Sequence, residues 1–242
     1  MKTFQLNLLA AAEQAGVKRF APSEYALPPS SQTEVEFDKT KLETWEVVAR
    51  AVEEGRIDAA RFPTGMWMNY LAVGAPFCQM EGLAGFREGA FLFHLDEDRP
   101  WVEVPVLSDG SGAYPRVSMT DIRDIGRFVA AAVEMEEDWG GRVLGMVGET
   151  MGFREVVELV ERWVGREIEV REVNEGELRE VVRTAGTGEF MKRMEAQICL
   201  VGCRDGFVVE PVLNRITGIR PMSITGFVER YWGGRHFTVG DD

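Results

Sequence analysis

Residues 17–25 read Val-Lys-Arg-Phe-Ala-Pro-Ser-Glu-Tyr, and this stretch decides the fold class of the chain. Apolar Val17 and Phe20 follow a helical segment that ends at Gly16, and the run closes in a polar Pro-Ser-Glu-Tyr loop. This order predicts a parallel strand of an α/β sheet. Ligands of open α/β sheets bind outside the carboxyl ends of the strands. We therefore expect the loop of residues 22–25 to line a binding cleft.

Helical and strand-like patterns alternate along the rest of the chain, as an α/β fold requires. Apolar residues at helical spacing predict helices over 3–15, 38–54, 153–164, most of 175–200, and 224–232. Short apolar or alternating runs predict strands over 57–62, 101–107 and 142–147, and an edge strand over 168–173. Asp38 is the expected N-cap of the second helix, and Ser118 with Asp121 has the spacing of a capping box before a further helix.

Composition restricts the class of partner and the compartment. The formal net charge of −13 disfavours nucleic acid and anionic membrane surfaces as partners. The chain has no apolar run near the roughly 18 residues that span a bilayer, and its first residues lack the order of a signal peptide. Its cysteines, Cys78, Cys199 and Cys203, are expected to be buried thiols in a reducing compartment. These observations predict a cytoplasmic protein.

Five segments carry a family resemblance. They are residues 15–25, the lysine-bearing helix with Trp45, Phe62-Pro-Thr-Gly-Met-Trp-Met-Asn-Tyr-Leu71, Asp124-Ile-Gly-Arg127, and Gly218-Ile-Arg-Pro with Tyr231-Trp232. In this order they resemble the NmrA-like and isoflavone-reductase-like proteins, a branch of the atypical short-chain dehydrogenases, and the fungal members above all. Asp124 and Arg127 are interpreted as structural residues that fix a helix end.

The resemblance implies a Rossmann-type domain that binds NADP(H) and a smaller C-terminal α+β domain that binds a small-molecule substrate. The first domain would comprise residues 1–74 and 117–150, and the second would comprise 75–116 and 151–242. Cofactor contacts are implied for Pro22, Ser23, Glu24, Tyr25, Thr64 and Gly65, and substrate contacts for Trp67, Met68 and Tyr70. The alternatives are a plain strand-ending loop for the first group and core packing for the aromatic group.

The resemblance also singles out a lysine. In the family, a lysine at the start of the helix after the Pro-Ser-Glu loop acts near the nicotinamide. The spacing to Trp45 matches Lys41, with Lys39 in reserve. A lysine can exchange protons with a substrate when burial and neighbouring charge adjust its pKa. From the residues alone both lysines are ordinary solvated side chains beside a helix cap, whereas the resemblance favours a catalytic Lys41.

One element of the family pattern has no counterpart. The Gly-rich turn that binds the pyrophosphate at a helix N-terminus is matched by none of the glycine clusters at 82–85, 110–112 and 145–148. The resemblance places the first strands and this turn before Met1. We therefore expect a partial sheet with an exposed edge at residue 17, a protein partner over that edge, and weak cofactor binding. A late-starting gene model, a degenerate paralogue and a truncated chain held by a partner each account for this departure.

Three functions remain open. The first is an NAD(P)H-dependent oxidoreductase that reduces a small aromatic or polyketide-like substrate, with Lys41 as the proton donor. The second is a non-catalytic NmrA-like regulator that senses a nucleotide, and the third is a degenerate remnant. Because regulators of this family lack the catalytic lysine, the presence of Lys41 favours the oxidoreductase.

Overall fold

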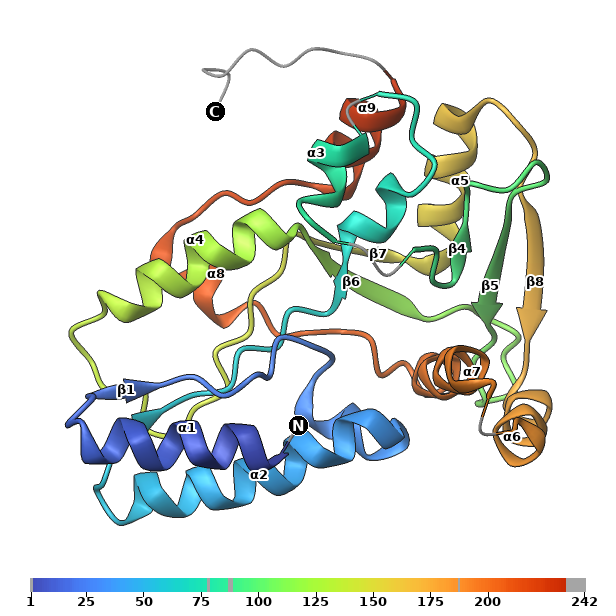
Figure 1. Cartoon of the computed structure of the whole chain (residues 1–242). Coiled ribbons are helices and arrows are strands. Elements are labelled where there is room, and N and C mark those ends of the chain that lie inside the picture. Colours follow the sequence, from blue (N-terminus) through green and yellow to red (C-terminus); the bar gives the residue numbers. More distant parts are fainter. Residues whose placement is uncertain (1, 78, 87–88, 187, 234–242) are drawn as a thin grey trace.

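The strands of the chain form three small sheets instead of one continuous sheet. The computed structural model describes residues 2–77, 79–86, 89–186 and 188–233, and the three sheets lie within these residues (Figure 1). Their strand orders are β1-β2, β3-β6-β7 and β4-β5-β8. The fold is α/β as predicted, but regular strand pairing is shorter than the sequence pattern suggested.

The first sheet contains a strand from the stretch of residues 17–25. Strand β1 (Arg19–Phe20) lies parallel to β2 (Asp58–Ala59). The segment 141–147 continues the parallel arrangement, because Arg61 forms a bridge with Val143, and the Leu144 amide donates to the Arg61 carbonyl at 2.8 Å. The predicted strands at 57–62 and 142–147 are therefore neighbours, although only part of each has regular strand geometry.

Helices cover both faces of this sheet. Helices α1 (Lys2–Gln14) and α2 (Glu36–Glu53) lie on one face, and α4 (Ile122–Val133) and α8 (Val212–Thr217) lie on the other (Figure 1). Successive side chains of a strand point to opposite faces. Accordingly, Ala59 packs in one core with Leu9 and Val48, whereas Ala60 packs in another with Phe128. The two cores hold the sheet between its helical layers.

The free edge of β1 is bordered by apolar side chains. Among the described residues β1 pairs with β2 alone. A groove of about 700 Å³ lies beside it, lined by residues that include Val17 and Val133, which are 45% and 55% exposed. The helix predicted over 3–15 is confirmed as α1, but its Phe4 is 75% exposed, and the helix packs through Leu9. The protein partner expected at this edge stays a prediction.

The other two sheets belong to a separate and larger core. Strand β6 (Arg116–Thr120) lies between β3 (Met66–Trp67), which is parallel to it, and β7 (Glu149–Gly152), which is antiparallel. In the third sheet, β5 (Trp101–Pro105) lies between β4 (Phe93–His94) and the parallel β8 (Glu169–Val173). The predicted edge strand over 168–173 is confirmed as β8.

Helices and 3-10 turns complete this larger core. They are η1 (Pro29–Glu34), η2 (Met68–Ala72), α3 (Gln79–Leu83), α5 (Phe153–Val164), α6 (Glu175–Thr184), α7 (Phe190–Gly202) and α9 (Ile224–Trp232). The helices predicted over 153–164 and 224–232 are confirmed as α5 and α9, and the helical region after residue 175 forms α6 and α7. No described helix is long and apolar enough to cross a membrane.

Two predicted helix caps are wrong. Helix α2 begins at Glu36 with Val35 as its N-cap, so Asp38 lies inside the first turn. Helix α4 is capped by Asp121 alone, whose carboxylate accepts a hydrogen bond from the Arg123 amide, while Ser118 belongs to β6. Helix α2 starts early because η1 ends at Glu34 and Val35 is the single extended residue between them, and α4 starts directly after β6 ends at Thr120. Cys199 and Cys203 are buried thiols as expected, and Cys78 lies outside the described residues.

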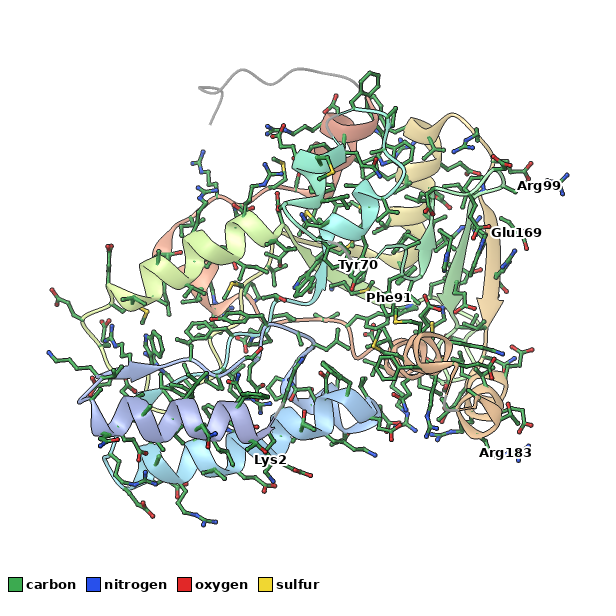
Figure 2. All side chains as sticks on the ribbon, in the orientation of Figure 1. Lys2, Tyr70, Phe91, Arg99, Glu169 and Arg183 are labelled. Atoms are coloured by element: carbon green, nitrogen blue, oxygen red, sulfur yellow. The ribbon has the colours of Figure 1, made fainter. Side chains whose placement is uncertain are left out.

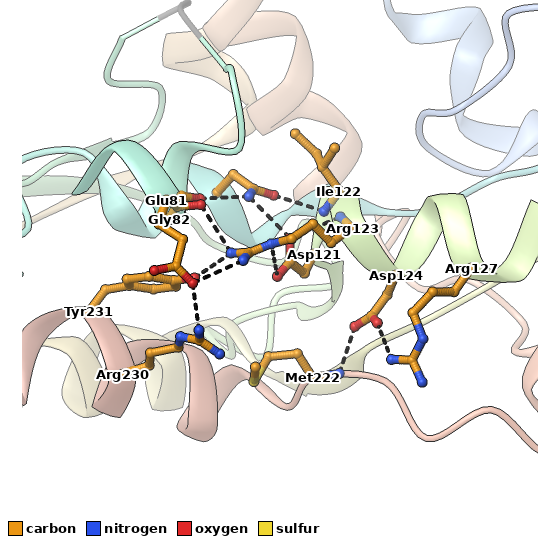
Figure 3. Close-up of polar contacts among 11 residues, drawn as sticks. Glu81, Gly82, Asp121, Ile122, Arg123, Asp124, Arg127, Met222, Arg230 and Tyr231 are labelled. Atoms are coloured by element: carbon orange, nitrogen blue, oxygen red, sulfur yellow. Dashed lines mark hydrogen bonds and ion pairs between the residues drawn. The ribbon is translucent and has the colours of Figure 1, made fainter. Parts of the chain in front are cut away.

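A polar network joins the N-terminus of α4 to the C-terminal part of the chain. Figure 3 shows Arg123 of α4 between the carboxylate of Asp121, Glu81 of α3 and the hydroxyl of Tyr231 in α9. Nearby, Asp124 accepts a hydrogen bond from the Met222 amide and pairs with Arg127, each at 2.7 Å. The Asp124 bond to Met222 joins α4 to the segment before α9, whereas its pair with Arg127 lies within α4.

A candidate active site around Lys41

The loop of residues 22–25 leaves β1 and is fixed to the end of the neighbouring strand. The amides of Thr64 and Gly65 donate to the carbonyl of Ala26 at 2.9 and 3.2 Å. The Ser23 amide donates to the side chain of Gln5 in α1 at 3.0 Å. The sequence thus brings the loop and residues 64–65 together at one end of the first sheet, as the position of the carboxyl ends of parallel strands predicts.

Glu24 of this loop is directed into the protein. Its side chain is buried, and its Oε2 atom accepts hydrogen bonds from Nε and Nη2 of Arg61 at 2.9 and 2.7 Å. Gln32 bonds both members of the pair, and the Arg61 guanidinium lies 5.3 Å from the centre of the Trp45 ring. Glu24 therefore anchors the loop from beneath. Contact of its side chain with a cofactor stays a prediction.

Lys41 lies on α2, one helical turn after Asp38. Its Nζ atom is 2.6 Å from the Asp38 carboxylate, and the two side chains are only 11% and 6% exposed. The Nζ atom also lies 5.6 Å from the centre of the Phe37 ring. Lys39, the reserve candidate, is an exposed residue and lines no hollow near this pair. The choice of Lys41 over Lys39 as the catalytic lysine stays a prediction.

An apolar hollow of about 190 Å³ opens beside the Lys41 ammonium. Its walls come from the loop after β1, the start of α2, the segment after β2, and α7. They comprise Tyr25, Ala26, Leu27, Val35, Phe37, Asp38, Lys41, Gly65, Met66, Trp67, Tyr70, Phe91, Met194 and Ile198. Tyr70 and Phe91 lie side by side with ring centres 5.2 Å apart (Figure 2). We call this space the aromatic hollow.

A second, narrow crevice lies on the other side of Lys41. It is lined by Gln5, Pro22, Ser23, Glu24, Thr40, Lys41 and Thr44. Lys41 is the residue common to the crevice and the aromatic hollow. The residues implied as cofactor contacts therefore divide between the two spaces: Pro22, Ser23 and Glu24 line the crevice, and Tyr25 and Gly65 line the hollow. A lysine between a polar loop and an aromatic wall can donate a proton to a ligand in the hollow.

Two residues implied as contacts do not reach either space. Thr64 is fully buried and donates its hydroxyl proton to the Gly65 carbonyl, and Met68 is fully buried in the larger core. Conversely, Met194 and Ile198 of α7 line the aromatic hollow, although no motif in the sequence marked them. They lie more than a hundred residues from Lys41 in the chain, so no local pattern could have revealed them.

Tyr25 contributes a hydroxyl group to the hollow. Burial raises the pKa of Tyr25 above its ordinary value, because the phenolate would lose hydration. Its ring stacks on Phe62 with centres 6.1 Å apart. The hydroxyl therefore stays protonated at neutral pH and can donate a hydrogen bond, while the pair of Lys41 and Asp38 supplies the ionic part of the hollow.

The described residues do not form a cradle for a pyrophosphate. Such a cradle needs a glycine-rich turn before a helix N-terminus free of negative charge. The first turns of α2, α4, α5 and α6 carry acidic side chains, and α5 is capped by Gly152 together with the carboxylate of Glu155. The N-cap of α7 is Glu189, and neither α8 nor α9 follows a glycine-rich turn. Contact of Pro22, Ser23, Tyr25 and Gly65 with the nicotinamide end of a dinucleotide stays a prediction.

The profile of the NmrA-like family matches residues 3–199 of the chain. This chain belongs to the NmrA-like family. Among curated proteins, the oxidoreductase BOA1 of Botryotinia fuckeliana is 30% identical over 162 residues, which is 66% of this chain and 48% of that protein. The bifunctional pinoresinol-lariciresinol reductase of Linum album is 25% identical over 209 residues, which is 85% of this chain and 59% of that protein. This NmrA-like chain thus spans about half of the length of these relatives.

Solved structures confirm the Rossmann-type α/β fold. The isoflavone reductase structure superposes with a TM-score of 0.65 at 15% identity, covering 96% of this chain and 71% of that chain. The complex of AtPrR2 with NADP+ and (+)pinoresinol gives a TM-score of 0.66 at 14% identity, covering 94% of this chain and 69% of that chain. The quinone oxidoreductase QOR2 of Escherichia coli, complexed with NADPH, gives a TM-score of 0.63 at 15% identity. The match covers 93% of this chain and 69% of that chain. At these identities the likeness concerns the fold of this NmrA-like protein.

Proposed function

We propose that this chain forms the substrate-binding and proton-donating side of an NAD(P)H-dependent reductase of small aromatic compounds. The observation that carries the proposal is the Lys41 ammonium, nearly buried and facing a hollow whose walls include Trp67 and Tyr70. Relatives named as a pinoresinol-lariciresinol reductase and a quinone oxidoreductase act on aromatic or quinoid molecules, which supports the same substrate class.

In this proposal each part of the site has one task. The rings of Trp67, Tyr70 and Phe91 hold an aromatic substrate by apolar contact, which favours planar ligands. Lys41 donates a proton to the substrate oxygen on which negative charge develops. NADP(H), when bound, would supply the hydride, and Pro22 and Ser23, which lie beside Lys41, are the proposed contacts of its nicotinamide end.

The proposed division assigns residues 1–74 and 117–150 to a nucleotide-side domain and residues 75–116 and 151–242 to a substrate-side domain. It matches the cores only in part, because β3 and β6 pack in the larger core and α8 packs on the first sheet. Met194 and Ile198 of the second part meet Lys41 and Tyr25 of the first part in the aromatic hollow. The site therefore lies where the two proposed domains meet, a common position for substrate pockets.

The first experiment is a titration of the purified chain with NADPH, followed by reduction of a small quinone under the same conditions. We expect saturable binding and turnover, with Lys41→Met reducing the rate about 10²-fold or more and Lys39→Met leaving it near that of the parent chain. No saturable NADPH binding would exclude the reductase activity for this chain. Saturable binding without turnover of any quinone or ketone would instead favour the nucleotide-sensing regulator.

A further inference from the structure

The charges of the aromatic hollow cancel. Of the residues that line it, only Lys41 and Asp38 carry full charges, and their charged groups are 2.6 Å apart. Both side chains are almost withdrawn from water, so solvent and salt screen the pair weakly. A ligand in the hollow therefore meets a dipole, whereas a lone lysine would present it with a net positive charge.

Asp38 occupies a favourable position for a carboxylate on α2. Asp38 lies in the first turn of α2, where the partial positive charge of the helix N-terminus stabilises an anion. Lys41 follows at the spacing of neighbours on one helix face, so the pair forms within a single turn. Such a pair is fixed before any ligand arrives, and ligand binding does not have to assemble it.

We propose that Asp38 is a specificity-determining residue, which makes the hollow select a neutral acceptor oxygen over an anionic one. This inference rests on the proposed function of Lys41 as the donor to the substrate oxygen. A neutral carbonyl or quinone oxygen accepts a hydrogen bond from the ammonium without disturbing the ion pair. A carboxylate or phenolate would be repelled by Asp38 at nearly the distance at which Lys41 attracts it, so its net attraction is small.

A matched pair of ligands tests this selection without cofactor or turnover. Acetophenone and benzoate have the same ring and similar size, but at pH 7 the first is neutral and the second is an anion. Dissociation constants of both are measured by calorimetry for the parent chain, Asp38→Asn, and Glu46→Gln. Glu46 is an exposed carboxylate on the same helix, so its variant controls for the change of net charge.

We expect the parent chain to bind acetophenone more tightly than benzoate. Asp38→Asn should lower the ratio of benzoate to acetophenone dissociation constants at least tenfold, and Glu46→Gln should leave it unchanged. If both ligands bind and Asp38→Asn leaves the ratio unchanged, the role of Asp38 is excluded while the hollow remains a ligand site. If neither ligand binds the parent chain, the aromatic hollow is not a substrate site, and the proposed function fails with this inference.

A second variant covers the case in which Asp38→Asn does not fold. Lys41→Gln removes the cation and leaves the Asp38 carboxylate facing the hollow. Benzoate binding should then weaken at least tenfold relative to acetophenone. An unchanged ratio in Lys41→Gln would overturn the proposal, because it would show that the two charges do not act on a ligand in the hollow.

Discussion

Arg61 donates two hydrogen bonds to a single carboxylate oxygen of Glu24, at 2.9 and 2.7 Å, with both side chains buried. Removing one partner of a buried ion pair leaves an uncompensated charge, which costs about 3–5 kcal/mol. Arg61→Met should therefore lower the free energy of unfolding, measured by urea denaturation, by an amount in this range.

The matched control for this pair is the double replacement of Glu24 and Arg61 by methionine. Replacing both members by apolar residues of similar size is often close to neutral. We expect the double variant to be more stable than Arg61→Met alone. Equal losses in the single and the double variant would show that the pair contributes through packing and not through charge.

Gly65 is the second position at which the loop geometry can be tested. Its φ of +69° is unfavourable for residues with a Cβ atom, and a Cβ there would lie 2.2 Å from the backbone oxygen of Ser118. Gly55 has a similar φ of +67° with no atom within 4 Å of such a Cβ. Gly55→Ala should cost about 1 kcal/mol from the backbone conformation alone, and Gly65→Ala should cost several times more. Similar melting temperatures for the two variants would contradict the close approach of Gly65 to Ser118.

A substitution in α7 tests the aromatic hollow while Lys41 is kept. Met194 lines the hollow, whereas Met191 on the same helix is 43% exposed and does not. Met194→Trp should fill the space and weaken acetophenone binding at least tenfold, and Met191→Trp should not change it. Circular dichroism of both variants verifies that α7 is intact. Retained affinity in Met194→Trp would place the ligand outside the hollow.

Glu103 on β5 gives the chain a pH-dependent stability. Burial, with a further contribution from Glu195, raises the pKa of Glu103 above the ordinary 4.5. The unfolded chain therefore loses this proton at lower pH than the folded chain does. Stability falls as the pH rises from about 4.5 through the pKa of the folded state.

The variant Glu103→Gln mimics the protonated carboxyl group at every pH. We expect its melting temperature to exceed that of the parent chain at pH 7 and to equal it near pH 4. Glu46→Gln, which removes an exposed carboxylate, serves as the comparison. A gain from Glu103→Gln that is the same at both pH values would argue for a packing effect instead of a proton-linked one.

The sequence predicts what is encoded locally. Helices α5 and α9 and the polar loop after β1 follow from short-range patterns, and all of them appear at the predicted residues. The ion pair between Asp38 and Lys41 was not predicted, because Asp38 was expected to cap α2. The helix begins earlier, with Val35 as its N-cap, and the Asp38 carboxylate pairs with Lys41 instead.

Distant contacts explain the remaining differences. Helical spacing alone does not say which apolar residues of α1 are buried: Leu9 packs against α2 and β2, whereas Phe4 is exposed. Met68 shares a motif with Trp67 and Tyr70, yet the 3-10 turn η2 directs it into the core. Periodicity marks which residues are apolar, and the tertiary arrangement decides which of them face a ligand.

Each of the three sheets is assembled from parts on both sides of the exposed segment 134–137. Arg61 pairs with Val143, β6 with β7, and β5 with β8. A backbone cut in this segment would therefore leave two polypeptides that stay bound to one another as a heterodimer. The first piece would keep the β1-β2 pair but lack β7 and β8, and the aromatic hollow would lack Met194 and Ile198 until the second piece binds. The protein is thus suited to reconstitution from two separately expressed halves, with ligand binding in the hollow as the signal of reassembly.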